Sequence, residues 1–301
     1  MNLIKNSFRI AIILMIAPLI SMSAYAQTTD EIKIATARIT DNLYMLQGWG
    51  GNMTVLFGDN GTFMVDHPSA NQFAKVKETI DSLGGGPIKY LFNTHYHRDH
   101  TGGNDLINQQ GATVYAHKNV YRTLSSGWKI DYFEIENPPL SKEWLSEVFI
   151  PDEMTYNVNN ENINTFHLAN AHSDGDVAIY FEKANVISVG DIFFNEMYPF
   201  IDLENGGTFK GLLKGLDTIL GIINQDTKVI PGHGPLTDFA GLKNYRDMLA
   251  EFVASIQAMI DSGKTLEQAI AAKPTAKYDE TNAGFIPPDD MVKFIYDDLS
   301  K

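Results

Sequence analysis

The sequence predicts a four-layer αββα sandwich of the α/β (α+β) class, in which two β-sheets pack face to face and helices cover their outer sides. Short β-rich runs come in two groups along the chain, and helical segments follow each group. No internal repeat and no linker rich in Pro, Gly or Ser divides the chain after its N-terminal segment. One domain with a helical extension is therefore expected.

Residues 1–26 have the features of a secretory signal peptide and are set apart from the fold. Lys5 and Arg9 give the segment a positive start, an apolar core follows, and small residues precede a cleavage site after Ala26. The apolar core of about 11 residues is shorter than the roughly 20 residues that a membrane-spanning helix needs. We therefore expect a periplasmic or secreted mature protein, residues 27–301, without a stable membrane anchor.

The mature chain of 275 residues is long enough for one large domain with a substantial core. It carries 21 Lys and Arg against 37 Asp and Glu, a net charge of about −16. Nucleic acid is not an expected partner, because its phosphates are bound by basic patches. A small-molecule substrate is expected instead, and no oligomeric state follows from these features. Because the chain has no cysteine, any metal must be held by nitrogen and oxygen.

Short strands and turns are expected to open the mature domain. Residues 43–47, 53–57 and 62–65 are β-rich runs separated by Gly50-Gly51-Asn52 and Asp59-Asn60-Gly61, which favour tight turns. Apolar residues at helical spacing then predict a helix over residues 71–83, which three glycines end. Further along we expect strands at 88–92 and 113–116, a helix at 119–124, and an irregular loop over the site at 131–152.

The second half of the chain continues with β-rich runs and then becomes helical. Strands are expected at residues 163–168, 177–181, 186–189 and 228–230, and helices at 209–223, 239–260 and 266–272. Residues from about 237 to 301 are expected to form the helical C-terminal extension of the same domain.

Four side chains that can bind metal follow the strand at 88–92 within six residues, His95-Tyr96-His97-Arg98-Asp99-His100. Alternate residues at a strand end point to the same side, so His95 and His97 can face one ion while the turn brings Asp99 and His100 round. A single histidine near a strand end is usually structural, but this spacing favours a metal site. Imidazole suits zinc, and carboxylate extends the choice to Fe or Mn.

Three later residues, His172, Asp191 and His233, each end a strand-like run. His233 lies in Pro231-Gly232-His233-Gly234-Pro235, whose glycines permit a tight turn close to other backbone. We expect these three side chains to complete the metal site.

The ordered set resembles the metallo-β-lactamase superfamily, whose His-x-His-x-Asp-His signature stands here at residues 95–100. The resemblance covers nearly the whole mature chain, from Gly50-Gly51-Asn52 and Val65-Asp66 to Pro231-Gly232-His233-Gly234. It implies two divalent metal ions, with Zn²⁺ expected and Fe or Mn as alternatives. It implies that the first ion is held by His95, His97 and His172, the second by Asp99, His100 and His233, and that Asp191 bridges both.

The resemblance also implies a reaction. The pair of Asp191 and His233 is more similar to glyoxalase II and the lactonases than to the antibiotic-destroying members, most of which have cysteine or serine in place of Asp191. A hydroxide shared by two metals would cleave an ester-like or amide-like bond in a lactone, a thioester or, less favoured, a β-lactam. Asp99 is expected to act in catalysis as well, by steering the nucleophile or a proton.

Two alternatives remain at this point: a mononuclear-iron oxygenase similar to persulfide dioxygenases, and a non-catalytic periplasmic protein that binds a metal or ligand. An open coordination position would distinguish a catalytic site from a structural one. Asp66 is expected to orient a ligand histidine. Trp49, Tyr198 and Phe200 either line a substrate cleft or pack in the core, and His67, His117 and His167 are expected to be structural or surface residues.

Overall fold

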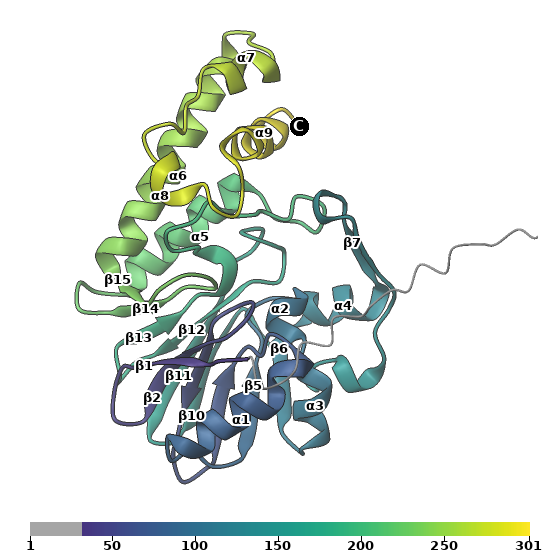
Figure 1. Ribbon diagram of the computed structural model, residues 1–301, viewed down its shortest axis with the longest axis vertical. Coiled ribbons are helices and arrows are strands. Elements are labelled where there is room, and N and C mark those ends of the chain that lie inside the picture. The colour runs from purple at the N-terminus through teal and green to yellow at the C-terminus, as the bar shows by residue number, and fades with distance from the viewer. Residues whose placement is uncertain (1–31) are drawn as a thin grey trace, which may run out of the picture.

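The computed structural model describes residues 32–301, so the predicted signal peptide lies outside the described residues. Within residues 32–301 the strands form a seven-stranded sheet, a six-stranded sheet and a two-stranded hairpin. The two large sheets pack face to face, with helices on their outer sides (Figure 1). The predicted αββα layering is confirmed.

The first sheet has the strand order β1-β2-β3-β4-β5-β6-β9. Neighbouring strands are antiparallel from β1 to β4 and parallel from β4 to β9. The strands are β1 (Ala35–Arg38), β2 (Leu43–Gln47), β3 (Met53–Leu56), β4 (Thr62–Val65), β5 (Ile88–Phe92), β6 (Thr113–His117) and β9 (Val148–Ile150). The parallel part brings the carboxyl ends of β4, β5 and β6 to one edge, where the chain continues into the predicted metal motif.

The second sheet has the order β10-β11-β12-β13-β14-β15, and its neighbours are antiparallel except for the parallel pair β13 and β14. The strands are β10 (Glu153–Val158), β11 (Glu161–His167), β12 (Val177–Phe181), β13 (Val186–Ser188), β14 (Lys228–Ile230) and β15 (Thr237–Asp238). Because β13 and β14 are parallel, the residues that follow them leave the sheet side by side.

Helices α1 (Phe73–Ser82) and α3 (Asn104–Gln109) pack against the outer face of the first sheet, and α5 (Phe209–Ile222) and α6 (Phe239–Asp261) lie outside the second. Asp238 begins α6 by accepting hydrogen bonds from the backbone N–H groups of Ala240 and Gly241. The remaining helices are η2 (Ala70–Gln72), α2 (Arg98–Thr101), α4 (Lys118–Ser126), η3 (Asp131–Phe133), η4 (Lys142–Trp144), η5 (Gly190–Ile192), α7 (Leu266–Ala271), α8 (Asp279–Asn282) and α9 (Pro288–Leu299). None of the described helices combines the length and the apolar character needed to cross a bilayer.

The burial of strand β2 shows why the sandwich needs apolar residues on both faces of its strands. Leu43 and Met45 point into the core between the two sheets, whereas Tyr44 and Leu46 pack in the core under α1 and α3. Successive side chains of a strand point to opposite faces, so a strand that is covered on both sides is apolar throughout. This is why the sequence shows continuous apolar runs here instead of an alternating pattern.

The region predicted as an irregular loop, residues 131–152, is more ordered than expected. Strands β7 (Trp128–Ile130) and β8 (Ile135–Asn137) form a hairpin, and β9 adds an edge strand to the first sheet. Strands of three residues contain few alternations and give a weak signal in a sequence, although the three-residue strand β14 was predicted. Strands β1, β10 and β15 were not predicted either. The residues of β1 are mostly exposed, those of β10 alternate between exposed and less exposed, and β15 has only two residues.

Phe181 on β12 and Phe63 on β4 interlock the two sheets. Their rings are fully buried and perpendicular, with centroids 5.8 Å apart. We expect Phe181→Ala to lower the free energy of unfolding by about 3–5 kcal/mol, because it leaves a cavity in a close-packed core. Urea unfolding of metal-free protein measures this change. Phe149→Ala, which truncates a half-exposed ring on edge strand β9, serves as the control with an expected change of about 0.5 kcal/mol or less. A loss below about 1 kcal/mol for Phe181→Ala would contradict the interlock.

Candidate metal centre

The seven side chains predicted as metal ligands converge at one edge of the sandwich, where loops leave strands of both sheets. The motif at residues 95–100 follows β5 of the first sheet and runs into α2. His172 follows β11, Asp191 lies in η5 after β13, and His233 follows β14, all in the second sheet. The parallel pairing of β13 with β14 explains why Asp191 and His233 are neighbours although 42 residues separate them.

The side chains form two groups. His95, His97, His172 and Asp191 are buried and place one nitrogen or oxygen atom each within 4.8 Å of the others. The ligand atoms of Asp99, His100 and His233 meet the same limit. These two groups correspond to the two ligand sets that the resemblance implies.

Asp191 lies between the two groups and turns one carboxylate oxygen toward each. Its Oδ2 is 3.6 Å from His95 Nε2 and 3.7 Å from His172 Nε2. Its Oδ1 is 3.0 Å from His100 Nε2 and 3.4 Å from His233 Nε2. In the second group, His233 Nε2 is also 3.1 Å from Asp99 Oδ2. A carboxylate in this position can contact a cation in either group.

Hydrogen bonds hold the outward-facing nitrogens of the first group. His172 Nδ1 donates to the Phe200 carbonyl at 2.8 Å, and His97 Nε2 donates to Asp202 Oδ2 at 3.1 Å. In a neutral imidazole the other nitrogen then carries a lone pair. His172 Nε2 and His97 Nδ1 are only 2.9 Å apart, so two lone pairs would repel each other there unless a cation lies between them.

Asp66 and Thr94 orient two further histidines through a chain of hydrogen bonds. His100 Nδ1 donates to Asp66 Oδ2 at 2.8 Å, and the Thr94 hydroxyl donates to the same oxygen at 2.7 Å. The Thr94 oxygen in turn accepts from His95 Nδ1 at 3.0 Å. The structure thus places Asp66 beside a predicted ligand histidine, as the sequence suggested. Fixing the outer nitrogen in this way sets the tautomer and the orientation of a ligand ring.

The charge states suit cation binding. Burial lowers the pKa of His172 to about 4 and holds the pKa of His95 well below its usual range, so both rings are neutral and can offer lone pairs. Burial would raise the pKa of Asp191, but His100 and His233 outweigh it and hold that pKa well below its usual range. Burial would likewise raise the pKa of Asp99, which His100 and His233 lower to about 2. Burial would lower the pKa of His100 and of His233, but Asp191 and Asp99 raise the pKa of His100 well above its usual range and that of His233 to about 9. The centre therefore combines ionised carboxylates with the neutral rings of His95 and His172 and the protonated rings of His100 and His233, whose inner protons a bound cation would displace.

Two buried atoms at the centre make no hydrogen bond within the described residues, His95 Nε2 and Asp191 Oδ1. Unpaired buried polar atoms are costly and rare in folded proteins, and at a functional site they indicate a missing ion or ligand. Nitrogen and oxygen donors in groups of three and four are the set that Zn²⁺ and similar divalent ions bind. The residues present therefore fit divalent metal ions.

Glycines allow the backbone to approach these side chains. A Cβ atom at Gly232 would collide with Asp191 Oδ1, and one at Gly51 would collide with the ring of His100. The two glycine-containing turns also hold each other, since Asn52 N donates to the Gly232 carbonyl at 2.7 Å and Asn52 Nδ2 donates to the Pro231 carbonyl at 2.9 Å. This contact explains why the Gly50-Gly51-Asn52 and Pro231-Gly232 sequences accompany the metal motif.

Some residues near the centre were not found from the sequence. Asp202 accepts from both His97 Nε2 and the Tyr96 hydroxyl, yet no local motif marks an aspartate that is 105 residues away from its histidine. Of the three aromatic residues left open, Trp49 and Phe200 line the pocket. Tyr198 is fully buried and donates to Asp279 Oδ1 at 2.8 Å, which makes it a packing residue.

The three remaining histidines lie outside the two groups. His67 is fully buried, and burial lowers its pKa to about 4. His117 and His167 stack with ring centroids 3.7 Å apart and join the ends of β6 and β11 across the two sheets. Asp152 approaches both rings at 3.5 and 3.7 Å. With Asp152 these two histidines form a third group whose ligand atoms lie within 4.8 Å of one another, so their expected structural role stays a prediction.

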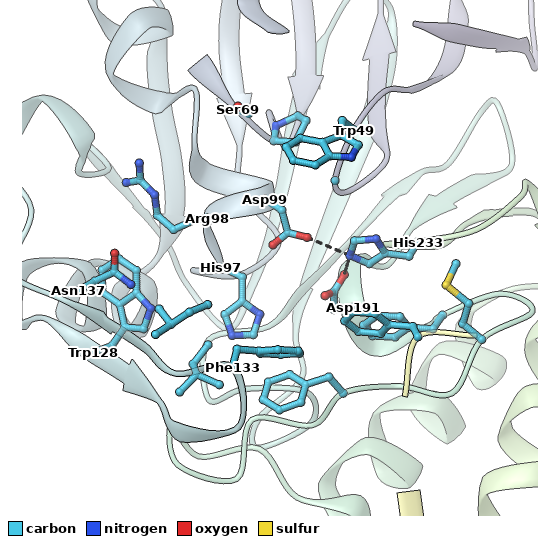
Figure 2. Close-up of a pocket in the computed structure, with 18 residues that line it drawn as sticks. Trp49, Ser69, His97, Arg98, Asp99, Trp128, Phe133, Asn137, Asp191 and His233 are labelled. Carbon is cyan, nitrogen blue, oxygen red and sulfur yellow. Dashed lines mark ion pairs between the residues drawn. The ribbon is translucent and has the colours of Figure 1, made fainter. Parts of the chain in front are cut away.

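A cavity of about 700 Å³ opens onto the centre. His97, Asp99, Asp191 and His233 reach its surface, and Figure 2 shows them between Trp49 on one side and Phe133 on the other. The centre is therefore accessible to a small molecule, as a catalytic site requires.

The family model of the metallo-β-lactamase superfamily matches residues 46–244, which include both ligand groups. The chain belongs to the metallo-β-lactamase superfamily. The predicted family is thereby confirmed, and with it the class of enzyme: the superfamily relatives of this chain are named as metallo-hydrolases.

Among curated relatives, a probable metallo-hydrolase of Bacillus subtilis is 28% identical over 174 residues, covering 54% of this chain and 76% of the relative. A hydroxyacylglutathione hydrolase of Pelagibacter ubique is 27% identical over 150 residues, covering 48% of this chain and 52% of the relative. The first relative shares the superfamily core, whereas the second is matched over about half of its length.

Solved structures share the fold. The DIM-1 metallo-β-lactamase superposes with a TM-score of 0.59 at 18% identity, covering 73% of this chain and 99% of that chain. A sec-alkylsulfatase from Pseudomonas sp. superposes with a TM-score of 0.66 at 17% identity, covering 87% of this chain and 50% of that chain. At these identities the likeness establishes the αββα architecture and no substrate.

Asp202→Asn provides a test of the hydrogen bond that orients His97. An amide can turn its NH₂ group toward the imidazole and no longer holds one tautomer, so we expect the affinity for Zn²⁺ to fall roughly 10–100-fold. Competition with a chromophoric chelator measures the affinity, and circular dichroism checks the fold. Asp226→Asn, at an exposed carboxylate far from the centre, should bind Zn²⁺ as the wild type does. An affinity within about twofold of the wild type for Asp202→Asn would show that Asp202 does not position His97.

Proposed function

We propose that this chain is an exported hydrolase of ester-like bonds that works with two divalent metal ions. His95, His97 and His172 would hold one ion, Asp99, His100 and His233 the other, and Asp191 would contact both. Zn²⁺ is the expected metal, with Fe or Mn as alternatives. The observation that carries the proposal is the placement of Asp191, whose two oxygens face one group each.

When bound, the ions supply Lewis acidity and lower the pKa of water toward neutrality. The protein contributes a carboxylate at the cavity surface, because the side chain of Asp99 is 42% exposed whereas Asp191 is buried. With its pKa of about 2, Asp99 is ionised at neutral pH, and its carboxylate could steer the attacking group or a proton that moves during the reaction. His233 Nε2 lies 3.1 Å from Asp99 Oδ2, so both side chains could approach the same ion.

The same geometry weighs against the two alternatives. A mononuclear-iron oxygenase would not need the complete second group of Asp99, His100 and His233. A structural metal site would be closed by protein, whereas this centre borders an open cavity. The carbonyl ester class, comprising lactones and thioesters, is favoured over β-lactams because an aspartate stands at position 191.

Single ligand substitutions test the two-ion arrangement. His172→Ala and His233→Ala each remove a ligand from a different group, so we expect bound Zn²⁺ to fall from two ions to one per chain in each variant. Asp191→Ala should weaken both ions. Mass spectrometry of dialysed protein counts the ions, and hydrolysis of a panel of lactones, thioesters and β-lactams should fall on the order of 10³-fold in all three variants.

The same panel defines the results that would refute this function. A wild-type chain that retains one ion, cleaves none of the panel and consumes oxygen with glutathione persulfide would be an oxygenase. A chain that binds metal without any turnover would be an accessory protein. Cleavage of β-lactams alone would refute the preference for ester-like bonds.

Export is the second part of the proposal and rests on residues 1–26 alone. Expression of the full chain in a Gram-negative host should yield a periplasmic protein whose first residue is Gln27, because the signal segment is removed after Ala26. Osmotic-shock fractionation and intact-mass measurement check the location and the N-terminus. Replacing Lys5 and Arg9 by Glu should retain the chain in the cytoplasm, and an uncleaved cytoplasmic wild type would refute export.

A further inference from the structure

We propose that the substrate is an uncharged ester, lactone or thioester with a bulky apolar arm. This inference rests on the proposed function and names the substrate class of the same site. The arm would lie against an aromatic wall, which we define as Trp128, Phe133, Phe194, Phe200 and Phe285. All five residues line the cavity at the metal centre.

Four rings of the aromatic wall, those of the phenylalanines, contact one another in a chain that reaches the predicted metal ligands. Phe194 stacks on His233 with ring centroids 5.0 Å apart, and Phe200 lies 6.1 Å from His97. Phe133 continues the wall outward, 4.8 Å from Phe200 and 5.8 Å from Phe285. A substrate whose reacting carbonyl is at the centre would therefore place an attached apolar group directly on these rings.

The mouth of the cavity exposes apolar side chains that a folded protein would otherwise bury. Within residues 32–301, four of the large hydrophobic residues with the greatest exposure line this cavity: Trp49 is 70% exposed, Phe285 47%, Ile135 40% and Phe133 36%. Large exposed apolar side chains that gather around one cavity indicate a binding site. Trp49 and Phe133 stand on opposite sides of Asp99 and His233, so an arm between them would be enclosed from both sides (Figure 2).

The aromatic wall is held in place by the C-terminal helices. Tyr132, at the tip of the β7–β8 hairpin, donates to Asp290 Oδ2 at 2.8 Å, and its ring packs against Phe294 at 4.8 Å. Both partners belong to α9. Because the hairpin is anchored at its tip, Phe133 and Ile135 form a fixed side of the cavity, and little ordering entropy opposes binding of an apolar arm.

Away from the metal centre, the described lining of the cavity has no side-chain cation that faces the space where a substrate arm would lie. Apart from the predicted metal ligands, Arg98 is the one lining residue of the described chain with a positive charge. Its guanidinium lies 4.0 Å over the ring of Trp144 and points away from Asp99 and His233 (Figure 2). Carboxylate groups of ligands are normally bound by Arg or Lys in charge-assisted hydrogen bonds. A substrate arm that ends in a carboxylate would therefore be disfavoured.

A matched series of phenyl esters tests the inference on zinc-loaded protein. The series contains the butanoyl ester, the decanoyl ester and a chain of the same ten carbons that ends in a carboxylate. Each fully buried methylene contributes about 0.8 kcal/mol, or about fourfold in binding. We expect kcat/KM to rise at least about tenfold from butanoyl to decanoyl, and to fall at least about tenfold when the carboxylate is added.

Two substitutions connect this selectivity to the aromatic wall. Phe133→Ala and Phe285→Ala remove rings that are partly exposed, so the fold should tolerate both, and each should lower the decanoyl-to-butanoyl ratio of kcat/KM about tenfold, mainly through KM. Phe149→Ala truncates an exposed ring on β9 outside the cavity and should keep the wild-type ratio. Phe133→Leu keeps an apolar side chain at this position, so its decanoyl-to-butanoyl ratio should lie between those of Phe133→Ala and the wild type.

Equilibrium dialysis of N-methyldecanamide, a neutral amide without an ester bond, separates this inference from the proposed function. Binding that Phe133→Ala weakens, in a chain that hydrolyses no ester, would support the apolar site and refute the hydrolase. Metal-dependent hydrolysis with no preference for the decanoyl ester, or with a preference for the carboxylate, would overturn the inference and leave the hydrolase standing. An unchanged ratio in both Phe→Ala variants would also overturn it.

Discussion

The buried, ionised carboxylate of Asp191 is the constraint on which the rest of this site depends. A carboxylate without compensating charge is very unfavourable inside a protein. Here imidazoles from both sheets surround it: His95 and His100 come from the loop after β5, and His172 and His233 from loops of the second sheet. The same side chain therefore organises the two ligand groups and joins the two sheets at this edge of the sandwich.

Buried hydrogen bonds around this centre orient the predicted ligand histidines. Asp66 and Thr94 hold His100 and His95, Asp202 holds His97, and the Phe200 carbonyl holds His172. Each of these bonds fixes the outer nitrogen of a ring and leaves the inner nitrogen free for a cation. Phe200 has a second part in the site, because its side chain belongs to the aromatic wall while its backbone positions His172.

The two large sheets and the elements that line the cavity have different roles in this site. The αββα core, shared with the solved structures, brings the ligand loops together. The β7–β8 hairpin and the segment before α9 line the cavity next to these loops, and the hydrogen bond from Tyr132 to Asp290 ties the hairpin to α9. The function of a protein depends on the site that is built on its fold. Here much of the cavity lining comes from the short hairpin and the segment before α9, whose sequences show no clear strand or helix pattern.

The sequence by itself determined the layering, the strands β2, β4, β5, β12 and β14 within their observed bounds, and the seven side chains that converge. These features can be recognised locally. The spacing of apolar residues within a short segment indicates a strand or a helix, and the predicted metal ligands stand directly after such strands. Only the tertiary structure decided that Asp202 holds His97, that Trp49 faces the cavity while Tyr198 packs away from it, and that residues 128–137 form a hairpin that lines the cavity. Those outcomes depend on which distant segments pack together. The sequence of one segment does not show which other segment it will contact.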